Sequence, residues 1–503
     1  MVLKQSLSKK SSLPKLAVFV FTLFIIWWSW QQWNFAKSTW EVRGDAHFYA
    51  ACAEHYFYTG ENRWFELYPI ALKENSGIHM SFSSFAFPFW ISLWIKMGYQ
   101  APNATLMATL SAYLSMVLSL GYWVKRFAGW QLATFAMALP LCFSKMSIFA
   151  VSGGAEALSM LFLVNAVGLL FLSRESSFTW LICITVSVLG AWIRPHNQLF
   201  LYGLFFPAIF SQPSQRLKYL AIFFLGVLTF HVMNFFVIDH SLKFSYLFSF
   251  LVGTEIYPQH SLFREYFSNG FQTQLLLEHK DQIFDKIHIA IRLLKLNWPW
   301  WMPQVLVMLL VLRISKNLGI WLCLFSLLCS IIFLAAMGHL VPRYWEMLQP
   351  VTYLCTFFMF VSRFESIRTE FSRANWLVLL SLLMIGSFIL KNWENYEPRD
   401  VNFTHVPTDL MEKIQHFPWV ACNQPAAFID LWKRPILLLP EKVSTVEDIH
   451  NEVQHLDALI LAPNYELSEY AAWVSENEHQ LRLAWNVYEY DDWVLFIRRS
   501  LEK

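Results

Sequence analysis

The chain has 503 residues, of which 56% are hydrophobic and only 15% are charged, against about a quarter charged in typical soluble domains. The formal net charge of +2 comes without a basic tract, which argues against a nucleic-acid partner. The 24 Trp and 19 Tyr residues belong to the two kinds that gather at membrane–water interfaces. These values exclude an ordinary soluble enzyme and indicate an α-helical protein that spans a membrane many times.

The chain begins with a lysine-bearing stretch that runs into the apolar segment Leu16–Trp33. No small-x-small cleavage site follows, as one would in a signal peptide. The segment ends in several tryptophans, as an interfacial belt does. We therefore expect an uncleaved anchor whose N-terminus lies in the cytoplasm.

A long mixed segment, residues 34–102, follows the anchor. Gly44 permits a sharp turn, and Asp45 stands where a helix can begin. The aromatic run Phe82–Met97 contains Pro88 and has about 16 residues, against about 20 needed to span a bilayer. It predicts a helix in the outer interface, with a true second span as the alternative. Residues 45–60 show helical spacing and predict a helix before this run. The residues expected on one side of it are Ala46, Tyr49, Ala50, Ala53 and Phe57.

The remaining apolar runs, together with the anchor, predict about eleven spans, several of them short. They are interrupted by a second long mixed segment, residues 239–297. The runs are Ala104–Val124, Trp130–Phe143, Ser147–Leu172, Phe178–Trp192, Leu199–Phe210, Tyr219–Ile238, Trp298–Leu312, Leu318–Met337, Met347–Val361 and Trp376–Leu390.

The loops between these runs differ in charge. If the spans alternate in direction, most of the Lys and Arg residues fall in one set of loops, which includes Lys125, Arg126, Arg216 and Lys218. Short basic loops stay in the cytoplasm, on the side of the basic N-terminus. Both long segments and the tail are then outside.

The tail has soluble composition and alternates strands with helices. The domain prediction is a transmembrane part, residues 1–391, and a small outer α/β domain, residues 392–503. Strands are expected at 419–421, 435–439 and 459–461 and in a hairpin formed by 481–488 and 493–498, and helices at 428–432, 446–456 and 466–475.

Three short motifs carry polar residues into or beside the apolar runs. Gly153-Gly154-Ala155-Glu156 opens one run, Trp192-Ile193-Arg194-Pro195 joins two short runs, and Pro342-Arg343-Tyr344-Trp345 precedes a late one. Together with Gly44-Asp45 in the first outer segment, their order resembles the GT-C superfamily of membrane glycosyltransferases. The similarity is greatest to bacterial families related to protein mannosyltransferases and lipid A aminoarabinose transferases. It implies a GT-C-like fold and a polyprenyl-phosphate-linked sugar donor.

The chemistry of such a donor needs one base and no acid. The leaving phosphate is already anionic, so a single carboxylate suffices, unlike the pair used by glycoside hydrolases. Asp45 is the candidate base that takes the proton of the acceptor, with inversion at the anomeric carbon. Arg194 and Arg343 are the candidates that stabilise the phosphate. The other candidate substrate-binding residues are Glu66, Lys73, His79, Glu156 and Tyr344.

Each of these residues also has a structural interpretation that the sequence leaves open. Asp45 and Glu156 can cap helices, and the two arginines can extend toward lipid headgroups. Lys73 and His79 can be solvated loop residues. No Asp-x-Asp, CxxC or helical His pair occurs, so no cofactor is predicted and a divalent metal stays an alternative. A disulfide between Cys52 and Cys422 is a further alternative.

The leading hypothesis is an inverting glycosyltransferase of the bacterial inner membrane, acting on its outer face. Its partners would be a polyprenyl-phosphate sugar, membrane lipid, and a lipid, glycan or protein acceptor. A transporter or lipid-linked-sugar flippase is the main alternative, although the two similar halves common in transporters are not evident. A membrane-anchored scaffold is the third, and it leaves Asp45 and the outer arginines unexplained.

Overall fold

The computed structural model of the chain describes residues 13–38, 44–59, 86–142, 147–172, 176–233, 375–393, 406–417, 420–422, 437–438, 456–461, 479, 482–483, 485–490 and 493–499. The predicted spans at 298–312, 318–337 and 347–361 lie outside these residues, as do the segment 239–297 and nearly all of the predicted tail helices.

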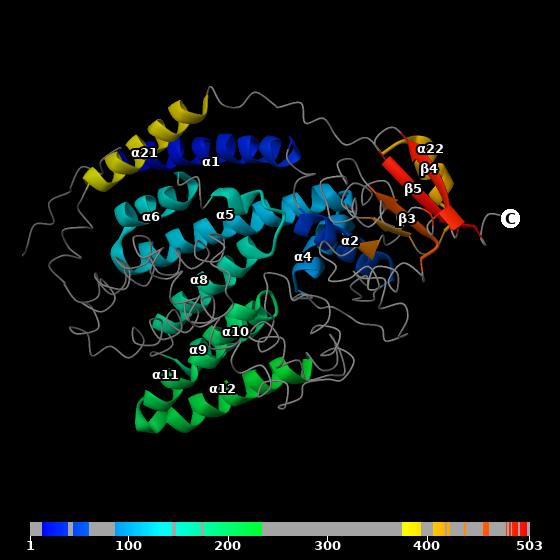
Figure 1. Cartoon of the computed structure of the whole chain (residues 1–503). Helices are drawn as coiled ribbons and strands as arrows, with labels where there is room; N and C mark the ends of the chain where they lie inside the picture. Colours follow the sequence, from blue (N-terminus) through cyan, green and yellow to red (C-terminus); the bar gives the residue numbers. More distant parts are fainter. Residues whose placement is uncertain are drawn as a thin grey trace, which may run out of the picture.

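The first 393 residues, as far as they are described, are helical (Figure 1). By length and composition, α5 and α12 can each cross a membrane, and several shorter apolar helices accompany them. The helices are α1 (Leu13–Ser38), α2 (Gly44–Thr59), α4 (Ala86–Lys96), α5 (Ala101–Ala128), α6 (Trp130–Cys142), η2 (Ile148–Ala150), α8 (Glu156–Leu172), α9 (Ser177–Ala191), α10 (Pro195–Gly203), α11 (Phe205–Phe210), α12 (Pro213–Met233) and α21 (Asn375–Trp393).

Two runs predicted as continuous are each divided. The run 147–172 forms the short η2 helix, then a turn in which Gly153 has a φ of 67°, and only then α8. The run 199–210 is divided between α10, which Pro195 begins, and α11. The first division has a local reason, because a left-handed glycine sets a helix boundary that hydrophobicity does not reveal. Pro195 sets the start of α10, four residues before the predicted run begins.

Paired contacts along the packed helices give their relative directions. Trp123 of α5 donates from Nε1 to Asn165 Oδ1 of α8 over 3.1 Å. The Phe127 and Phe171 rings, which lie 6.0 Å apart, come later in both helices, so α5 and α8 are parallel. Cys183 of α9 donates to the Ala166 carbonyl of α8. Gly190, which comes later than Cys183 in α9, lies against Phe162, which comes earlier than Ala166 in α8. The α9 helix is therefore antiparallel to α8.

The α12 helix runs parallel to α9, because Trp180 stacks on Tyr219 and Trp192 stacks on Phe230. The end of α5 and the start of α12 therefore lie at the same end of the bundle. We call it the basic end, because it holds Lys125, Arg126, Arg216 and Lys218. The opposite end, where α5, α8 and α10 begin, is called the α2 end.

The α4 helix docks on the first half of α5, where Trp90 Nε1 donates to the Ala108 carbonyl over 3.1 Å. The α2 helix packs on α4 with the Tyr49 and Phe87 rings 4.9 Å apart. The inner face predicted for α2 is buried at Ala46, Tyr49, Ala50 and Ala53. Phe57, which shares this side of the helix by its spacing, lies on the last turn, where it is 40% exposed and its ring packs edge-on against Tyr58.

The tail contains a five-stranded sheet beyond the α2 end (Figure 1). Its order is β2-β1-β3-β5-β4. β1 pairs in parallel with β2 and β3, and β5 pairs antiparallel with β3 and β4. The strands are β1 (Val420–Cys422), β2 (Leu437–Leu438), β3 (Ala458–Leu461), β4 (Trp485–Tyr490) and β5 (Trp493–Arg498). All five predicted strand positions are confirmed, but β4 begins and ends later than the predicted 481–488.

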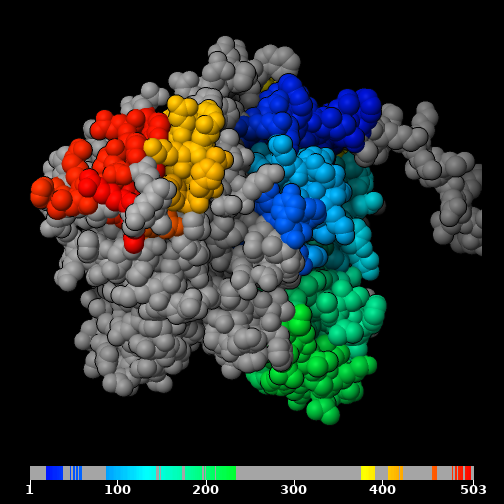
Figure 2. All heavy atoms as spheres, turned by 90° about the vertical axis from the view of Figure 1, so that its right-hand side faces the viewer, coloured from blue at the N-terminus to red at the C-terminus, as the bar shows by residue number. Residues whose placement is uncertain are grey.

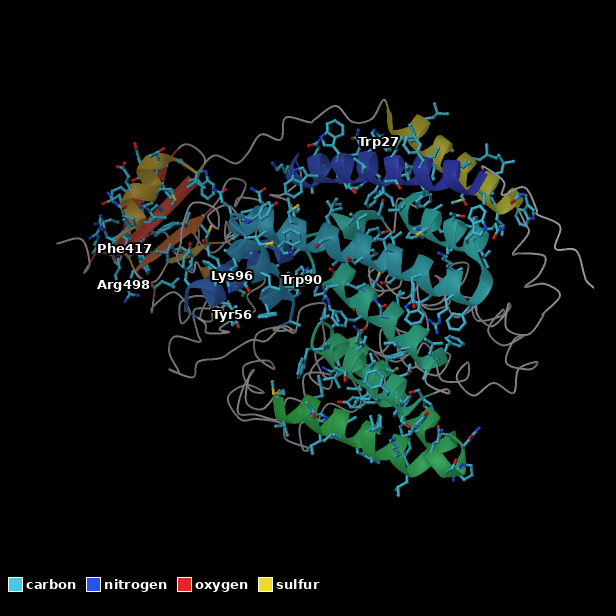
Figure 3. The ribbon with its side chains drawn as sticks, turned by 180° about the vertical axis from the view of Figure 1, so that it is seen from behind. Trp27, Tyr56, Trp90, Lys96, Phe417 and Arg498 are labelled. Atoms are coloured by element: carbon cyan, nitrogen blue, oxygen red, sulfur yellow. The ribbon has the colours of Figure 1, made fainter. Side chains whose placement is uncertain are left out.

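A helix that the sequence did not predict, α22 (Thr408–Ile414), packs on this sheet through Leu410 and Ile414. Cys422 belongs to this second core and Cys52 to the core of the bundle, and they form no disulfide with each other. Viewed toward the α2 end, the sheet and α22 occupy one side and α1 and α2 the other (Figure 2). Figure 3 shows Tyr56, Trp90 and Lys96 at this end, with Phe417 and Arg498 of the tail beyond them.

Candidate functional site

Asp45 is the second residue of α2, in the first turn of that helix. The helix start predicted at this point is therefore present, and the predicted turn before it falls on residues outside the described ranges. The buried Ala46, Tyr49 and Ala50 hold this turn against the neighbouring helices. The backbone places Asp45 at the start of a packed helix belonging to the α2 end.

Glu156 opens α8 and follows a turn formed around its carboxylate. The Gly154 N–H donates to Ser152 Oγ over 3.2 Å, and Gly153 has the positive φ of the turn. A Cβ on Gly154 would lie 2.0 Å from Glu156 Oε2. Glycine at 154 therefore gives the carboxylate room to lie back against the turn.

Arg194 stands immediately before α10, with extended backbone angles of φ −148° and ψ 138°. Proline disfavours the helical conformation in the residue before it and is well suited to the first helical position. Pro195 thus both begins α10 and fixes the backbone of Arg194. The Arg-Pro pair noted in the sequence is a helix start with an arginine at its tip.

Glu156 and Arg194, predicted as separate site residues, form one ion pair. Arg194 Nη2 donates to Glu156 Oε1, and the side chains are only 10% and 3% exposed, respectively. Transferring two charges out of water carries a large desolvation cost, which their attraction offsets only in good geometry. The start of α8 is therefore tied to the start of α10 by opposite charges in the bundle interior.

A second, neutral contact lies one turn farther along both helices. Asn197 Nδ2 donates to Ser159 Oγ and to the Gly190 carbonyl, each over 3.0 Å. Asn197 Oδ1 is buried and accepts no hydrogen bond from any residue that the structure describes. Both contacts join residues 38 positions apart, so together they form two rungs between parallel helices, which we call the polar ladder.

Sequence reasoning missed Ser159 and Asn197. The signal was present, because each lies three residues after a predicted charged residue, and residues three apart share a helix face. Recognising it required knowing that the starts of α8 and α10 meet.

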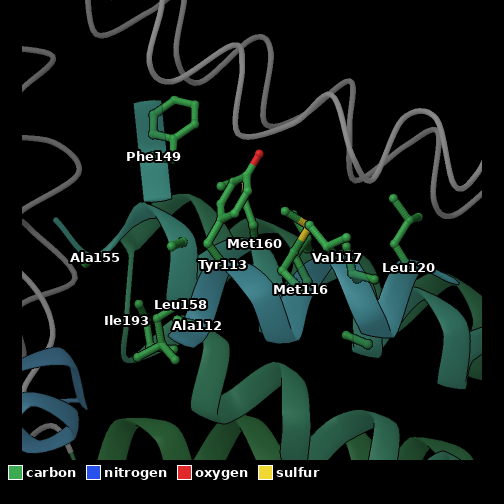
Figure 4. Close-up of a cluster of buried hydrophobic side chains, with 14 of the residues drawn as sticks. Ala112, Tyr113, Met116, Val117, Leu120, Phe149, Ala155, Leu158, Met160 and Ile193 are labelled. Atoms are coloured by element: carbon green, nitrogen blue, oxygen red, sulfur yellow. The ribbon is translucent and has the colours of Figure 1, made fainter. Parts of the chain in front are cut away.

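The surroundings of the polar ladder are apolar. Figure 4 shows Ile193 beside Leu158 of α8 and Ala112 of α5. All three are buried, as is Ala155 just before Glu156. Electrostatic interactions are stronger in such surroundings than in water, so the charge of Arg194 is weakly screened there.

Other predicted site residues cannot be placed relative to this ladder. Glu66, Lys73, His79, Arg343 and Tyr344 lie outside the described residues. Within the described ranges, no group of three or more His, Cys, Asp or Glu side chains is arranged to hold a metal ion.

No protein-family model matches the sequence, and no curated protein matches it in a sequence comparison. Solved structures do match. ArnT from Cupriavidus metallidurans in the apo state superposes with a TM-score of 0.54 at 11% identity, covering 95% of this chain and 98% of that chain. The same protein bound to undecaprenyl phosphate gives a TM-score of 0.55 at 10% identity, covering 95% and 97%.

A third match is the archaeal oligosaccharyltransferase AglB from Archaeoglobus fulgidus, in complex with an inhibitory peptide and a dolichol-phosphate. Its TM-score is 0.51 at 11% identity, covering 96% of this chain and 74% of that chain. At these identities the likeness establishes the fold. The resemblance predicted from the sequence is confirmed at that level, because the chain shares the fold of these GT-C structures.

Proposed function

We propose that the chain is an integral membrane glycosyltransferase that moves a sugar from a polyprenyl-phosphate donor to an acceptor on the outer face of the membrane. The observation that carries the proposal is the fold shared with ArnT bound to undecaprenyl phosphate and with AglB bound to a dolichol-phosphate. The two bound molecules, undecaprenyl phosphate and the dolichol-phosphate, are both lipid phosphates. A donor of this class is therefore the first to test.

The sidedness of the bundle supports a donor carried by lipid. Lys and Arg concentrate in cytoplasmic loops, so the basic end belongs in the cytoplasm and the α2 end outside. Nucleotide sugars are made in the cytoplasm. An enzyme whose site opens at the α2 end needs a sugar that has already crossed the membrane, such as one on a polyprenyl phosphate.

The proposed chemistry uses Asp45 as general base. Its carboxylate takes the proton of the acceptor nucleophile while that nucleophile attacks the anomeric carbon. The bond to the phosphate breaks, the electron pair stays on the phosphate oxygen, and the configuration inverts. The phosphate leaves as an anion, so no general acid is required.

Positive charge near the leaving phosphate would stabilise the anion that develops. Arg194, at the α2 end, and Arg343 are assigned this role, because a guanidinium binds phosphate through paired donors. Lys73 and His79, in the first outer segment, are assigned to help the arginines at the phosphate. Glu66 is assigned to the acceptor or sugar hydroxyls, and Tyr344 to substrate binding. The acceptor class is a lipid, a glycan or a protein.

The direct test is donor consumption by purified protein in detergent. A panel of undecaprenyl-phosphate-linked sugars is supplied with membrane extract as the acceptor source, and released undecaprenyl phosphate is measured. Asp45→Asn should lower the release about 10²–10⁴-fold, the usual contribution of a general base. Asp409→Asn, the same exchange on the exposed surface of α22, is the matched control. Undiminished release by a normally folded Asp45→Asn protein would contradict the assignment.

The rival flippase function is tested with the same protein in liposomes. A lipid-linked sugar that crosses the bilayer with its glycosidic phosphate bond intact, and is not consumed when acceptor is added, would favour transport. Release of undecaprenyl phosphate only in the presence of acceptor would favour transfer.

A further inference from the structure

We infer that Glu156 is a positioning residue that acts on the donor through Arg194, holding the guanidinium in place for the phosphate. The sequence had suggested instead that Glu156 contacts the substrate directly. The inference rests on the proposed function for the identity of the phosphate. It is carried by the polar ladder and by the backbone around its charged rung.

The charged rung is not needed to align the two helices. The Asn197–Ser159 rung and the bond from Asn197 to the Gly190 carbonyl already fix α10 against α8 and α9 with neutral groups. A buried ion pair is often no more stabilising than apolar side chains of the same volume. Stability alone therefore gives weak grounds for a glutamate and an arginine at this position.

The local backbone restricts the position of both side chains of the charged rung, the ion pair between Glu156 and Arg194. Pro195 fixes the backbone of Arg194, and the Ser152–Gly154 turn leaves room for the Glu156 carboxylate where any other residue at 154 would place a Cβ. Two restricted partners give a guanidinium with a defined position. A positioned charge is what stabilisation of a developing anion requires.

The chemistry of the pair fits a phosphate better than a sugar hydroxyl. A guanidinium is planar, always charged, and presents its N–H donors in a fork that matches phosphate oxygens. The carboxylate of Glu156 is already engaged by Arg194. Glu156 is thus suited to orient the arginine, and the arginine to bind the anion.

The test compares variants that separate charge from packing. Glu156→Met/Arg194→Met removes both charges at similar volume, so the protein should keep a melting temperature close to the wild type. Glu156→Gln keeps an acceptor of the same shape but removes the negative charge. Asn165→Leu, which removes a neutral polar contact farther along α8, is the matched control.

Two readouts are used: binding of undecaprenyl phosphate in detergent micelles, and the KM and kcat for the lipid-linked donor. The Met/Met double variant should bind undecaprenyl phosphate at least tenfold more weakly. Glu156→Gln should raise the donor KM about tenfold with a smaller change in kcat. Asn165→Leu should leave both readouts unchanged.

Several results would overturn the inference. One is wild-type binding by the Met/Met double variant, which would make the pair purely structural. Another is a Glu156→Gln variant with unchanged KM, or one that loses kcat while KM is unchanged, which would place Glu156 at the reacting atoms. A wild-type protein that binds undecaprenyl phosphate but transfers no sugar would remove the proposed function alone. A wild-type protein that neither binds undecaprenyl phosphate nor transfers sugar would contradict both the proposed function and this inference.

Discussion

Two polar clusters on α8 lie about two turns apart and are built differently. The polar ladder at the start of the helix contains an ion pair, Glu156 with Arg194, and a buried Asn197 Oδ1 that accepts nothing within the described residues. In the cluster at the middle of α8, Asn165 Oδ1 accepts from Trp123 and Asn165 Nδ2 donates to Ser119 and to the Leu161 carbonyl. The middle cluster is neutral, and Asn165 is bonded through both ends of its amide.

The difference separates packing from function. A neutral and fully bonded amide joins helices at little cost in a membrane protein. A buried charge is expensive and is found mainly where a substrate, ion or proton is handled. The glycines follow the same division, since Gly154 makes room for a carboxylate and Gly168 makes room for the Trp123 ring.

The largest expected effect comes from breaking the ion pair on one side. Arg194→Met leaves the Glu156 carboxylate buried without its cation, which should lower the free energy of unfolding by about 3–5 kcal/mol. Unfolding in detergent, followed by circular dichroism, measures this. If the single variant is as stable as the Met/Met double variant, the pair is not buried as described.

Gly168→Ala should have the next largest effect on stability. The added Cβ would meet the Trp123 ring at 2.2 Å, and a ring packed between α5 and α8 cannot move aside easily. Overpacking of this kind costs about 1–3 kcal/mol. Gly386→Ala in α21, whose Cβ would meet nothing within 4 Å, is the control and should be neutral or slightly stabilising. Transfer per folded molecule should not change in either variant.

Asn165→Leu should cost less, because interhelical hydrogen bonds in membrane proteins contribute about 0.6 kcal/mol on average. The variant leaves the Trp123 N–H and Ser119 without their Asn165 bonds. The measurement is the melting temperature together with donor KM. A large rise in KM would show that the middle cluster also belongs to the site and would erase the contrast between the two clusters.

Gly154→Ala should have the smallest effect on stability and a clear effect on activity. The new Cβ meets only the end of the Glu156 side chain, whose carboxylate can shift slightly and stay paired with Arg194 at a cost below about 1 kcal/mol. The guanidinium of Arg194 is then held in a different position. The donor KM should rise while the melting temperature stays near the wild type, and a KM that does not change would contradict the role given to Glu156.

The sequence predicted much of the fold, because apolar runs and alternating strands reflect burial directly. The helices α5, α6, α9 and α12 and the five strands all lie at positions that the pattern predicts. The seven-residue helix α22 was missed, since so short a segment shows too little periodicity. The spacing puts Phe57 on the same side of its helix as four buried residues, but helical spacing does not reveal that this last turn is exposed.

The candidate site was only half predictable. Glu156 and Arg194 were both recognised, from a helix start and from a boundary arginine, but as separate groups. Their contact spans 38 residues and depends on α8 and α10 running parallel, which is a tertiary property. Asn197 was missed for the same reason.

The central claim is that the α2 end, which carries Asp45, Glu156 and Arg194, faces away from the cytoplasm. Two matched exposed glutamines test it: Gln100 at the start of α5, at the α2 end, and Gln212 just before α12, at the basic end. Each is changed to Cys in a chain whose seven native cysteines are replaced, and a membrane-impermeant maleimide is applied to spheroplasts. We predict labelling of Gln100→Cys in intact spheroplasts and of Gln212→Cys only after permeabilisation. The reverse pattern would contradict the account.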